Sequence, residues 1–381
     1  MISQSNFMII LQVDNSYGVN RYMKQVSRLL MIFVLGIISI QAVIAQDAVS
    51  ELEYNPTLCW DSEVLSEACL AMMEAFPEPN LEEIMEDRTT LSTFSFWRVG
   101  PQAVNLYNAP GGDVIGEIPA GFNFVNAIDT TVDGWIQRVG GEWVSREDAT
   151  YVPASYYNGL LLPEDWQYPI AYILDRTGIY ASLRPGEEGS AESGYVTRRY
   201  DLVNIFAEER DENGDLWYLI GPNQWIHQHF VSKFERIERP EGVDGHWVAV
   251  DLFEQTLIAY EDDTPVFATM ISSGLAQWPT NEGIFEIWAR LDRDAMSGAT
   301  GAPGAYALQD VPWTMYFDDG ISLHGTYWHD DFGYRHSHGC VNLSISDARW
   351  VYDWTLRAEP DEDGNITNYV YVHSSQDYDE K

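Results

Sequence analysis

Short apolar runs that alternate with polar residues, broken by turns rich in Gly, Asn and Pro, recur through most of this chain. Residues 247–252 and 256–260 are two such runs separated by a short turn, and residues 265–271 continue the alternation. Because successive side chains of a β-strand point to opposite faces, this pattern predicts half-buried strands. We therefore expect a mostly β fold, and 381 residues are enough for two or three domains.

An internal repeat links residues 104–149 with residues 178–231. Each segment begins with an apolar residue followed by Tyr, continues with Pro, and ends with Asp and two Trp eight positions apart: Trp135 and Trp143, then Trp217 and Trp225. Alternating runs with Gly and Asn turns are what small closed barrels require, and both segments resemble bacterial SH3-like modules, which are common on exported wall enzymes. The Trp side chains either bind the wall or, as we favour, form the core of modules that act as spacers.

The N-terminal residues 1–45 are predicted to be an export signal. Arg21, Lys24 and Arg28 precede an apolar run that ends in Val43-Ile44-Ala45, where signal peptidase needs small residues. Met23 is a more natural start than Met1. The alternative is a retained anchor helix, although the run is at the lower limit for a membrane span. We therefore expect an exported protein of the periplasm or cell wall.

The net charge of the chain excludes some classes of binding partner. The chain has 59 acidic residues against 21 Lys and Arg, a formal net charge of -38. No basic face is available for nucleic acid or for anionic lipid, so neither partner is expected, and no integral membrane partner is predicted. Composition alone predicts no oligomeric state.

The three cysteines fall into two groups. Cys59 and Cys69 lie ten residues apart in an acidic segment with a predicted helix at residues 62–76, and an exported protein can keep such a pair oxidised. Cys340 is then the unpaired thiol, which is either a buried bystander or a reactive group.

The residues around Cys340 favour a reactive group. His324-Gly325 precedes Ser337-His338-Gly339-Cys340 by a loop, and Asn342 follows. A thiol near its free pKa of about 8.5 is mostly protonated at neutral pH, so a nucleophilic Cys needs an adjacent base, which His324 can supply. Gly before Cys allows a tight turn, so the amides of Gly339 and Cys340 are candidate donors of an oxyanion hole.

This pattern resembles the signature of the YkuD-type L,D-transpeptidases over residues 245–375, and Pro279-Thr280 with Gly283-Ile284-Phe285 also matches. The resemblance implies a β-rich domain that crosslinks peptidoglycan stem peptides without a metal or organic cofactor. It makes Cys340 the nucleophile and His324 the proton acceptor and donor.

The resemblance also implies roles for other residues of the predicted site. Ser337 and His338 would shape the site, Gly339 would supply an oxyanion donor, and Tyr316, Gly325 and Asn342 would contact substrate. Family members often have a polar residue directly after the first His. Because Gly325 stands there in this chain, a backbone carbonyl must orient the imidazole.

Several alternatives remain open. An L,D-carboxypeptidase would use the same residues and let water take the thioester. A papain-like endopeptidase is disfavoured because its Cys precedes its His, and a non-catalytic wall-binding protein is disfavoured by the intact Cys and His. A zinc site has suitable ligand types in His324, His329, His338 and Cys340, but no paired Cys motif supports it.

The predicted organisation is mostly β, with two SH3-like barrels before the catalytic domain and a short helical segment before the barrels. Its parts are the signal at 1–45, the acidic helical segment at 46–93, modules at 94–153 and 168–236, and the L,D-transpeptidase domain at 245–375.

Overall fold

The computed structural model describes residues 58–59, 65–166, 168–299, 304–360 and 366–377. All of them belong to one compact unit, residues 56–381. The predicted export signal at 1–45 lies outside the described residues. Among the helices of the described ranges, none is long and apolar enough to cross a membrane.

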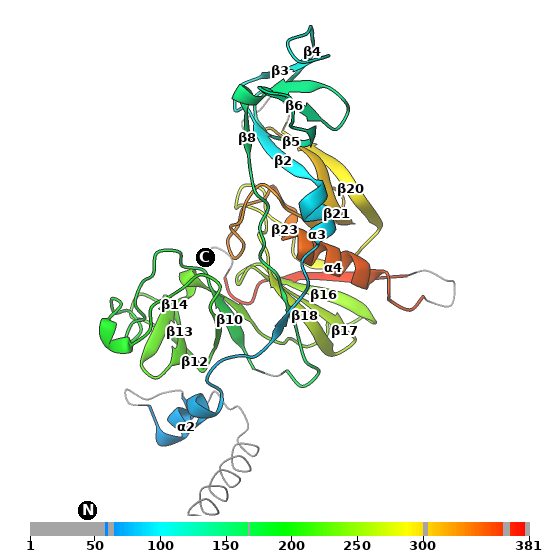
Figure 1. Ribbon diagram of the computed structural model, residues 1–381. Helices are drawn as coiled ribbons and strands as arrows, with labels where there is room; N and C mark the ends of the chain where they lie inside the picture. The colour runs from blue at the N-terminus through cyan, green and yellow to red at the C-terminus, as the bar shows by residue number, and fades with distance from the viewer. Residues whose placement is uncertain (1–57, 60–64, 167, 300–303, 361–365, 378–381) are drawn as a thin grey trace, which may run out of the picture. The chain divides into compact units, whose positions relative to one another are not determined.

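The protein is mostly β, as predicted (Figure 1). One sheet has seven strands in the order β1 (Glu82–Glu83), β9 (Leu160–Leu161), β18 (Thr264–Met270), β17 (Thr256–Glu261), β16 (His246–Asp251), β24 (Tyr369–His373) and β19 (Gly283–Glu286). Only the β16–β24 pair within it is parallel. Strands β16, β17 and β18 confirm the three runs predicted from alternation.

A second sheet has eleven strands. Its main path is β23 (Val341–Leu343), β22 (Ile321–Gly325), β21 (Tyr306–Asp318), β5 (Phe122–Asp129), β6 (Trp135–Arg138), β7 (Trp143–Ser145), β3 (Val104–Tyr107) and β4 (Val114–Ile118). Strand β2 (Ser95–Val99) pairs with β5 and with β8 (Ala149–Tyr151), and β20 (Ala289–Gly298) pairs with β21. This sheet carries the strands that hold the unpaired cysteine.

Two three-stranded sheets complete the β structure. They have the orders β11 (Leu202–Asn204), β10 (Ile170–Ile173), β15 (Val231–Phe234) and β12 (Ala207–Arg210), β13 (Leu216–Gly221), β14 (Gln224–His227). The described helices longer than one turn are α2 (Glu67–Ala75), α3 (Arg88–Thr93) and α4 (Ile345–Thr355).

Strands β16 and β17 are buried on both faces, which explains their nearly continuous apolar sequence. Side chains at alternate positions enter two different cores. Val248, Val250, Leu257 and Ala259 join the core that includes β21 to β23 and helix α4. Trp247, Ala249, Ile258 and Tyr260 join the core that includes residues of β10 and β15. The seven-stranded sheet is thus fixed from both sides.

Helix α4 begins where Ser344 accepts a hydrogen bond from the Asp347 amide, 3.1 Å away. It buries Ala348, Val351 and Thr355, which lie three or four residues apart and so share one helix face, against the core shared with β21 and β22 (Figure 1). The carboxylate of Asp347 accepts hydrogen bonds from the Gly159 amide at 2.7 Å and the Thr269 hydroxyl at 2.6 Å. The first turn of α4 is therefore tied to two strands of the seven-stranded sheet.

The acidic N-terminal segment contains the predicted helix and disulfide. Helix α2 begins after Ser66, whose side chain caps it, later than the predicted start at residue 62. Cys59 and Cys69 form a disulfide, which confirms the predicted pairing.

The two repeated segments fold as β structure, and each pair of repeated Trp residues lies in a hairpin, β6–β7 or β13–β14. No sheet of the described ranges closes into a barrel, so the SH3-like classification stays a prediction. Strand β5 of the first segment pairs in parallel with β21, across the expected domain boundary.

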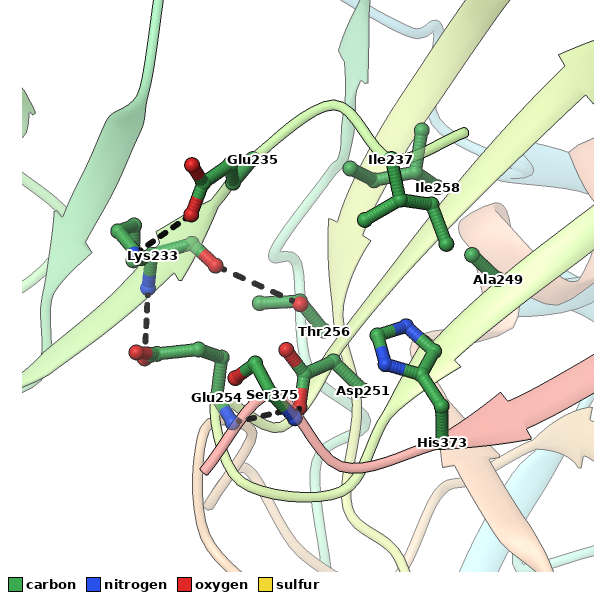
Figure 2. A pocket seen from close by; sticks show the side chains of 10 residues that line it. All are labelled: Lys233, Glu235, Ile237, Ala249, Asp251, Glu254, Thr256, Ile258, His373 and Ser375. Atoms are coloured by element: carbon green, nitrogen blue, oxygen red, sulfur yellow. Dashed lines mark hydrogen bonds and ion pairs between the residues drawn. The ribbon is translucent and has the colours of Figure 1, made fainter. Parts of the chain in front are cut away.

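A charged cluster joins the second repeated segment to the seven-stranded sheet (Figure 2). The ammonium group of Lys233 on β15 forms ion pairs with Glu208 and Glu235, and its backbone amide donates to the Glu254 carboxylate at 3.0 Å. Burial alone would lower the pKa of Lys233, but the surrounding carboxylates outweigh it and hold that pKa above its usual value. The cluster is therefore a satisfied structural network rather than a reactive amine.

Candidate active site

Cys340 and His324 are brought together by the parallel pairing of β22 with β23. The register places Leu323 opposite Val341 and His324 opposite Asn342. Cys340 directly precedes β23, and its sulfur accepts a hydrogen bond from the Ser322 hydroxyl at 3.7 Å. Ser322 and His324 share one face of β22, because side chains two positions apart point the same way. The imidazole and the thiol are thus neighbours on adjacent strands.

The two groups are offset along the strands. Cys340 aligns with Ser322 and His324 with Asn342, a separation of two residues or about 6.6 Å along a parallel strand. The imidazole makes no hydrogen bond with the sulfur within the described structure. Its Nδ1 atom lies 3.3 Å from the carbonyl oxygen of Gly325. A backbone carbonyl therefore contacts the ring, as expected from the Gly that follows His324.

Burial determines the charge of both groups. His324 is only 2% exposed, and its removal from solvent lowers the pKa of the imidazole to about 4. Burial raises the pKa of the Cys340 thiol, and the hydrogen bond from Ser322 offsets this only in part. Both groups are neutral at pH 7. His324, expected to act as the base, therefore does not ionise the thiol in the resting site.

The turn before Cys340 is held by Ser337 and Thr280. The Ser337 hydroxyl donates to the carbonyl of Cys340 and accepts from the Gly339 amide at 3.1 Å. The Thr280 hydroxyl donates to the Gly339 carbonyl at 2.7 Å, and Gly339 has a φ of +117°, which favours glycine. Because the Gly339 amide is engaged, the Cys340 amide is the remaining candidate among the two predicted oxyanion donors.

His338 points to aromatic side chains. Its ring stacks on Trp278 with centroids 3.8 Å apart and lies 5.0 Å from the ring of Tyr306. Burial lowers the pKa of the imidazole, and its Nε2 atom is buried without a hydrogen-bond partner among the described residues. His338 thus lies against two aromatic residues that sequence reasoning missed, and its role in shaping the site stays a prediction.

The three predicted substrate contacts differ in accessibility. Tyr316 is half-buried, donates its hydroxyl to Asp294 at 2.7 Å, and stacks near Trp288, which is 62% exposed. Burial and the hydrogen bond to Asp294 raise the pKa of Tyr316. Tyr316 thus lies beside an exposed aromatic residue, where a substrate can reach it.

Gly325 and Asn342 are buried, so the structure does not favour direct contact with substrate for either residue. A Cβ atom on Gly325 would lie 2.9 Å from Pro312, which explains why a larger polar residue does not stand here. The Asn342 side chain is 2.8 Å from the Nε2 atom of His329.

Comparison with known proteins identifies the family of the segment that contains Cys340 and His324. Residues 245–366 match the YkuD family, described as the L,D-transpeptidase catalytic domain. The chain therefore contains a YkuD-type L,D-transpeptidase catalytic domain. The matched residues end at 366, before strand β24, and the predicted domain limits of 245–375 stay a prediction.

Relatives of the L,D-transpeptidase domain cover only part of the chain. A segment of 96 residues is 32% identical to L,D-transpeptidase 2 of Mycobacterium tuberculosis and spans 23% of each protein. An L,D-transpeptidase from Stackebrandtia nassauensis is 27% identical, with 36% of this chain and 60% of that chain covered and a TM-score of 0.28. The catalytic domain of the Enterococcus faecium enzyme is 23% identical, with 35% and 99% covered and a TM-score of 0.30.

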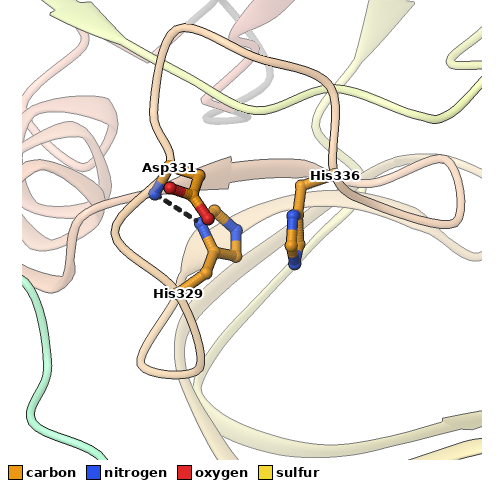
Figure 3. Close-up of side chains that lie close together, drawn as sticks. All are labelled: His329, Asp331 and His336. Atoms are coloured by element: carbon orange, nitrogen blue, oxygen red, sulfur yellow. Dashed lines mark hydrogen bonds between the residues drawn. The ribbon is translucent and has the colours of Figure 1, made fainter. Parts of the chain in front are cut away.

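The loop between the two motifs of the L,D-transpeptidase domain gathers a further group of side chains. His329, Asp331 and His336 place one potential ligand atom each within 4.8 Å of the others (Figure 3). The rings of His329 and His336 have centroids 4.0 Å apart. These residues differ from the four that the sequence offered as a zinc site, of which only His329 belongs to the group.

Proposed function

We propose that the chain is a peptidoglycan L,D-transpeptidase that forms crosslinks through a thioester on Cys340. The observation that carries the proposal is the pairing of β22 with β23, which sets Cys340 and His324 on adjacent strands, two residues apart in register, in a domain of the L,D-transpeptidase family. Cys340 is half-buried.

In the proposed first step, the Cys340 sulfur attacks the carbonyl of the third stem residue. A carbon–sulfur bond forms, the thiol proton passes to His324 and then to the leaving nitrogen, and the terminal D-amino acid departs. Because both groups are neutral at rest, the proton moves during attack rather than before it. With Nδ1 donating to the Gly325 carbonyl, Nε2 is the nitrogen that accepts the proton.

In the second step, an amine of a neighbouring stem attacks the thioester. The amine gives a proton to His324, a new amide forms, and the sulfur recovers its proton as the carbon–sulfur bond breaks. One amide is exchanged for another, so no nucleotide energy is required. The Cys340 amide is the proposed donor to the oxyanion, and donors of this kind contribute about 10²- to 10³-fold in rate.

Water in place of the amine would make the protein an L,D-carboxypeptidase. The two activities are separated by digesting peptidoglycan from cells that express the chain and analysing the fragments by mass spectrometry. New links between third-position residues support the transpeptidase, and shortened tripeptide stems alone support the hydrolase. Unchanged wall with soluble, folded protein, matching that from cells expressing Cys340→Ala, would contradict both and favour a binding role.

We also propose export to the periplasm or cell wall, with residues 1–45 as the signal and the segments at 94–153 and 168–236 as SH3-like spacers. The Cys59–Cys69 disulfide supports export, because such bonds persist in oxidising compartments. N-terminal sequencing of the protein from an expressing cell tests this: a mature start after residue 45 supports a cleaved signal, and retention of residues 23–45 contradicts it.

A further inference from the structure

The loop that connects β22 to β23 has the ligand pattern His-x-Asp-x₄-His, formed by His329, Asp331 and His336. We propose that these three side chains bind one divalent transition-metal ion, in a site separate from Cys340 and His324. The side chains face one another across the loop (Figure 3). This inference does not depend on the transpeptidase activity, because binding can be measured without turnover.

The donor set indicates the class of ion. Two imidazole nitrogens and one carboxylate oxygen leave a fourth position for water, as in many Zn²⁺ sites, and also suit other first-row transition metals. Ca²⁺ and Mg²⁺ prefer ligand sets built from oxygen, so a pair of imidazoles disfavours them. The separation of up to 4.8 Å between ligand atoms is longer than the distance between two ligands of one bound ion, so a small closure of the loop accompanies binding.

The backbone on the Cys340 side of this loop is already fixed. The amides of His336 and Ser337 both donate to the carbonyl of Ser273 at 3.0 Å. On the other side, the Ser272 hydroxyl donates to the carbonyl of Asp331 at 3.1 Å. The three ligands are thus presented by a loop anchored to one segment, which reduces the ordering cost of binding.

The two ring nitrogens of His329 can serve different functions. Nδ1 can bind the ion, and Nε2 can carry the ring proton and donate it to a neighbouring side chain. Its Nδ1 atom accepts from the Asp331 amide at 3.1 Å, on the edge that faces Asp331, and its Nε2 atom contacts the Asn342 side chain. An ion bound to Nδ1 would replace the hydrogen bond from the Asp331 amide, and the ring proton would then be on Nε2. The Oδ1 atom of Asn342 is buried without a described partner, and a turned amide would let it accept that proton.

Asp331 also forms an ion pair with Arg176 through its Oδ1 atom at 2.6 Å. This contact leaves the second carboxylate oxygen for the ion. Arg176 carries a positive charge close to the site, which weakens binding of a cation. Both side chains are about half exposed, so solvent screens much of this repulsion.

Titration of the purified full chain with Zn²⁺ alone, followed by equilibrium dialysis and metal analysis, tests the site. We expect one ion per chain in the wild type and in Cys340→Ala. Replacing a ligand should weaken binding by at least the roughly 10- to 100-fold seen when a residue that only orients a metal ligand is changed. His336→Ala tests this, and Asp331→Asn provides a conservative second variant that keeps the shape of the side chain. His227→Ala, in β14, is the matched histidine control.

Substitution with Co²⁺ reports the ligand type by its absorption spectrum. A spectrum without a thiolate charge-transfer band, identical in wild type and Cys340→Ala, supports the His-Asp-His site. Three results would overturn the proposal: no stoichiometric Zn²⁺ in the wild type, unchanged affinity in both His336→Ala and Asp331→Asn, or loss of binding in Cys340→Ala.

Discussion

The hydroxyl of Ser322 donates a hydrogen bond to the sulfur of Cys340 across 3.7 Å, from the same face of the strand that carries His324. This contact links the two motifs directly, because Ser322 and His324 are two residues apart on β22. It also acts on the chemistry, since the hydrogen bond lowers the pKa of a thiol that burial raises. The resting site thus holds a protonated thiol.

Because the Cys340 thiol is protonated at rest, its alkylation by iodoacetamide should depend on pH in a defined way. Because the thiolate is the reactive form and burial raises the thiol pKa, the rate should rise continuously through pH 8.5 without a plateau between about pH 5 and 8. Ser322→Ala should move the profile to still higher pH, because it removes the hydrogen bond that lowers this pKa. A plateau at low pH would indicate a preformed thiolate and imidazolium pair instead.

Thr280 should be needed for the turn before Cys340. Thr280→Val removes the donor to the Gly339 carbonyl and the acceptor for the Gly274 amide, both buried contacts. We expect a loss of about 1–3 kcal/mol in the free energy of unfolding, measured by urea denaturation, and slower acylation by a β-lactam. Thr280→Ser keeps the hydroxyl and should stay close to the wild type. Equal behaviour of the two variants would show that the hydrogen bond has no such role.

Asp347 should make stability fall as pH rises. Its burial raises the carboxyl pKa from 3.8 to about 7, so the folded protein retains a proton that the unfolded chain releases. The stabilisation is complete below the unfolded pKa and is lost as pH rises through about 7. Asp347→Asn removes this dependence: its amide oxygen can still accept from the Gly159 amide, and its NH₂ group can donate to the Thr269 hydroxyl, which can accept as well as donate. Relative to the wild type it should therefore gain up to about 4 kcal/mol between pH 4 and 8.

Chemical denaturation at several pH values measures this gain. Asp353→Asn, on the same helix with a half-exposed carboxylate, should leave the pH dependence nearly unchanged. A parallel pH dependence in the wild type and Asp347→Asn would be inconsistent with a raised pKa at Asp347.

Lys233 should be essential for joining β15 to the seven-stranded sheet. Lys233→Ala removes the cation that pairs with the carboxylates of Glu208 and Glu235. Because those carboxylates are 32% and 53% exposed, the expected loss is about 1–3 kcal/mol, less than for a fully buried ion pair. Thermal unfolding should show a lower Tm, while Lys233→Arg should retain part of the stability. A Tm for Lys233→Ala equal to that of the wild type would mean that solvent already screens these charges.

The sequence predicts best what depends on nearby residues. Strands β16 to β18 and helix α4 follow from their own periodicity, and the motif around Cys340 places Ser337 and Gly339 in one turn because they are adjacent in sequence. The pairing of Cys59 with Cys69 follows equally from local spacing and the expected compartment.

Long-range features could not be predicted in this way. Trp278 and Tyr306 flank His338 only because sheet pairing returns distant segments to it, and neither belongs to a recognisable motif. The offset between His324 and Cys340 depends on the register of β22 with β23. Their neutral state depends on burial, which the types of the residues do not reveal.

The most direct test of the account is the intact mass of the protein after incubation with a carbapenem-type β-lactam, which mimics the acyl donor. The account predicts one adduct per wild-type chain, located at Cys340 by peptide mapping, and none in a folded Cys340→Ala variant. An adduct that persists in Cys340→Ala, or that maps to another residue of the wild type, would contradict Cys340 as the nucleophile.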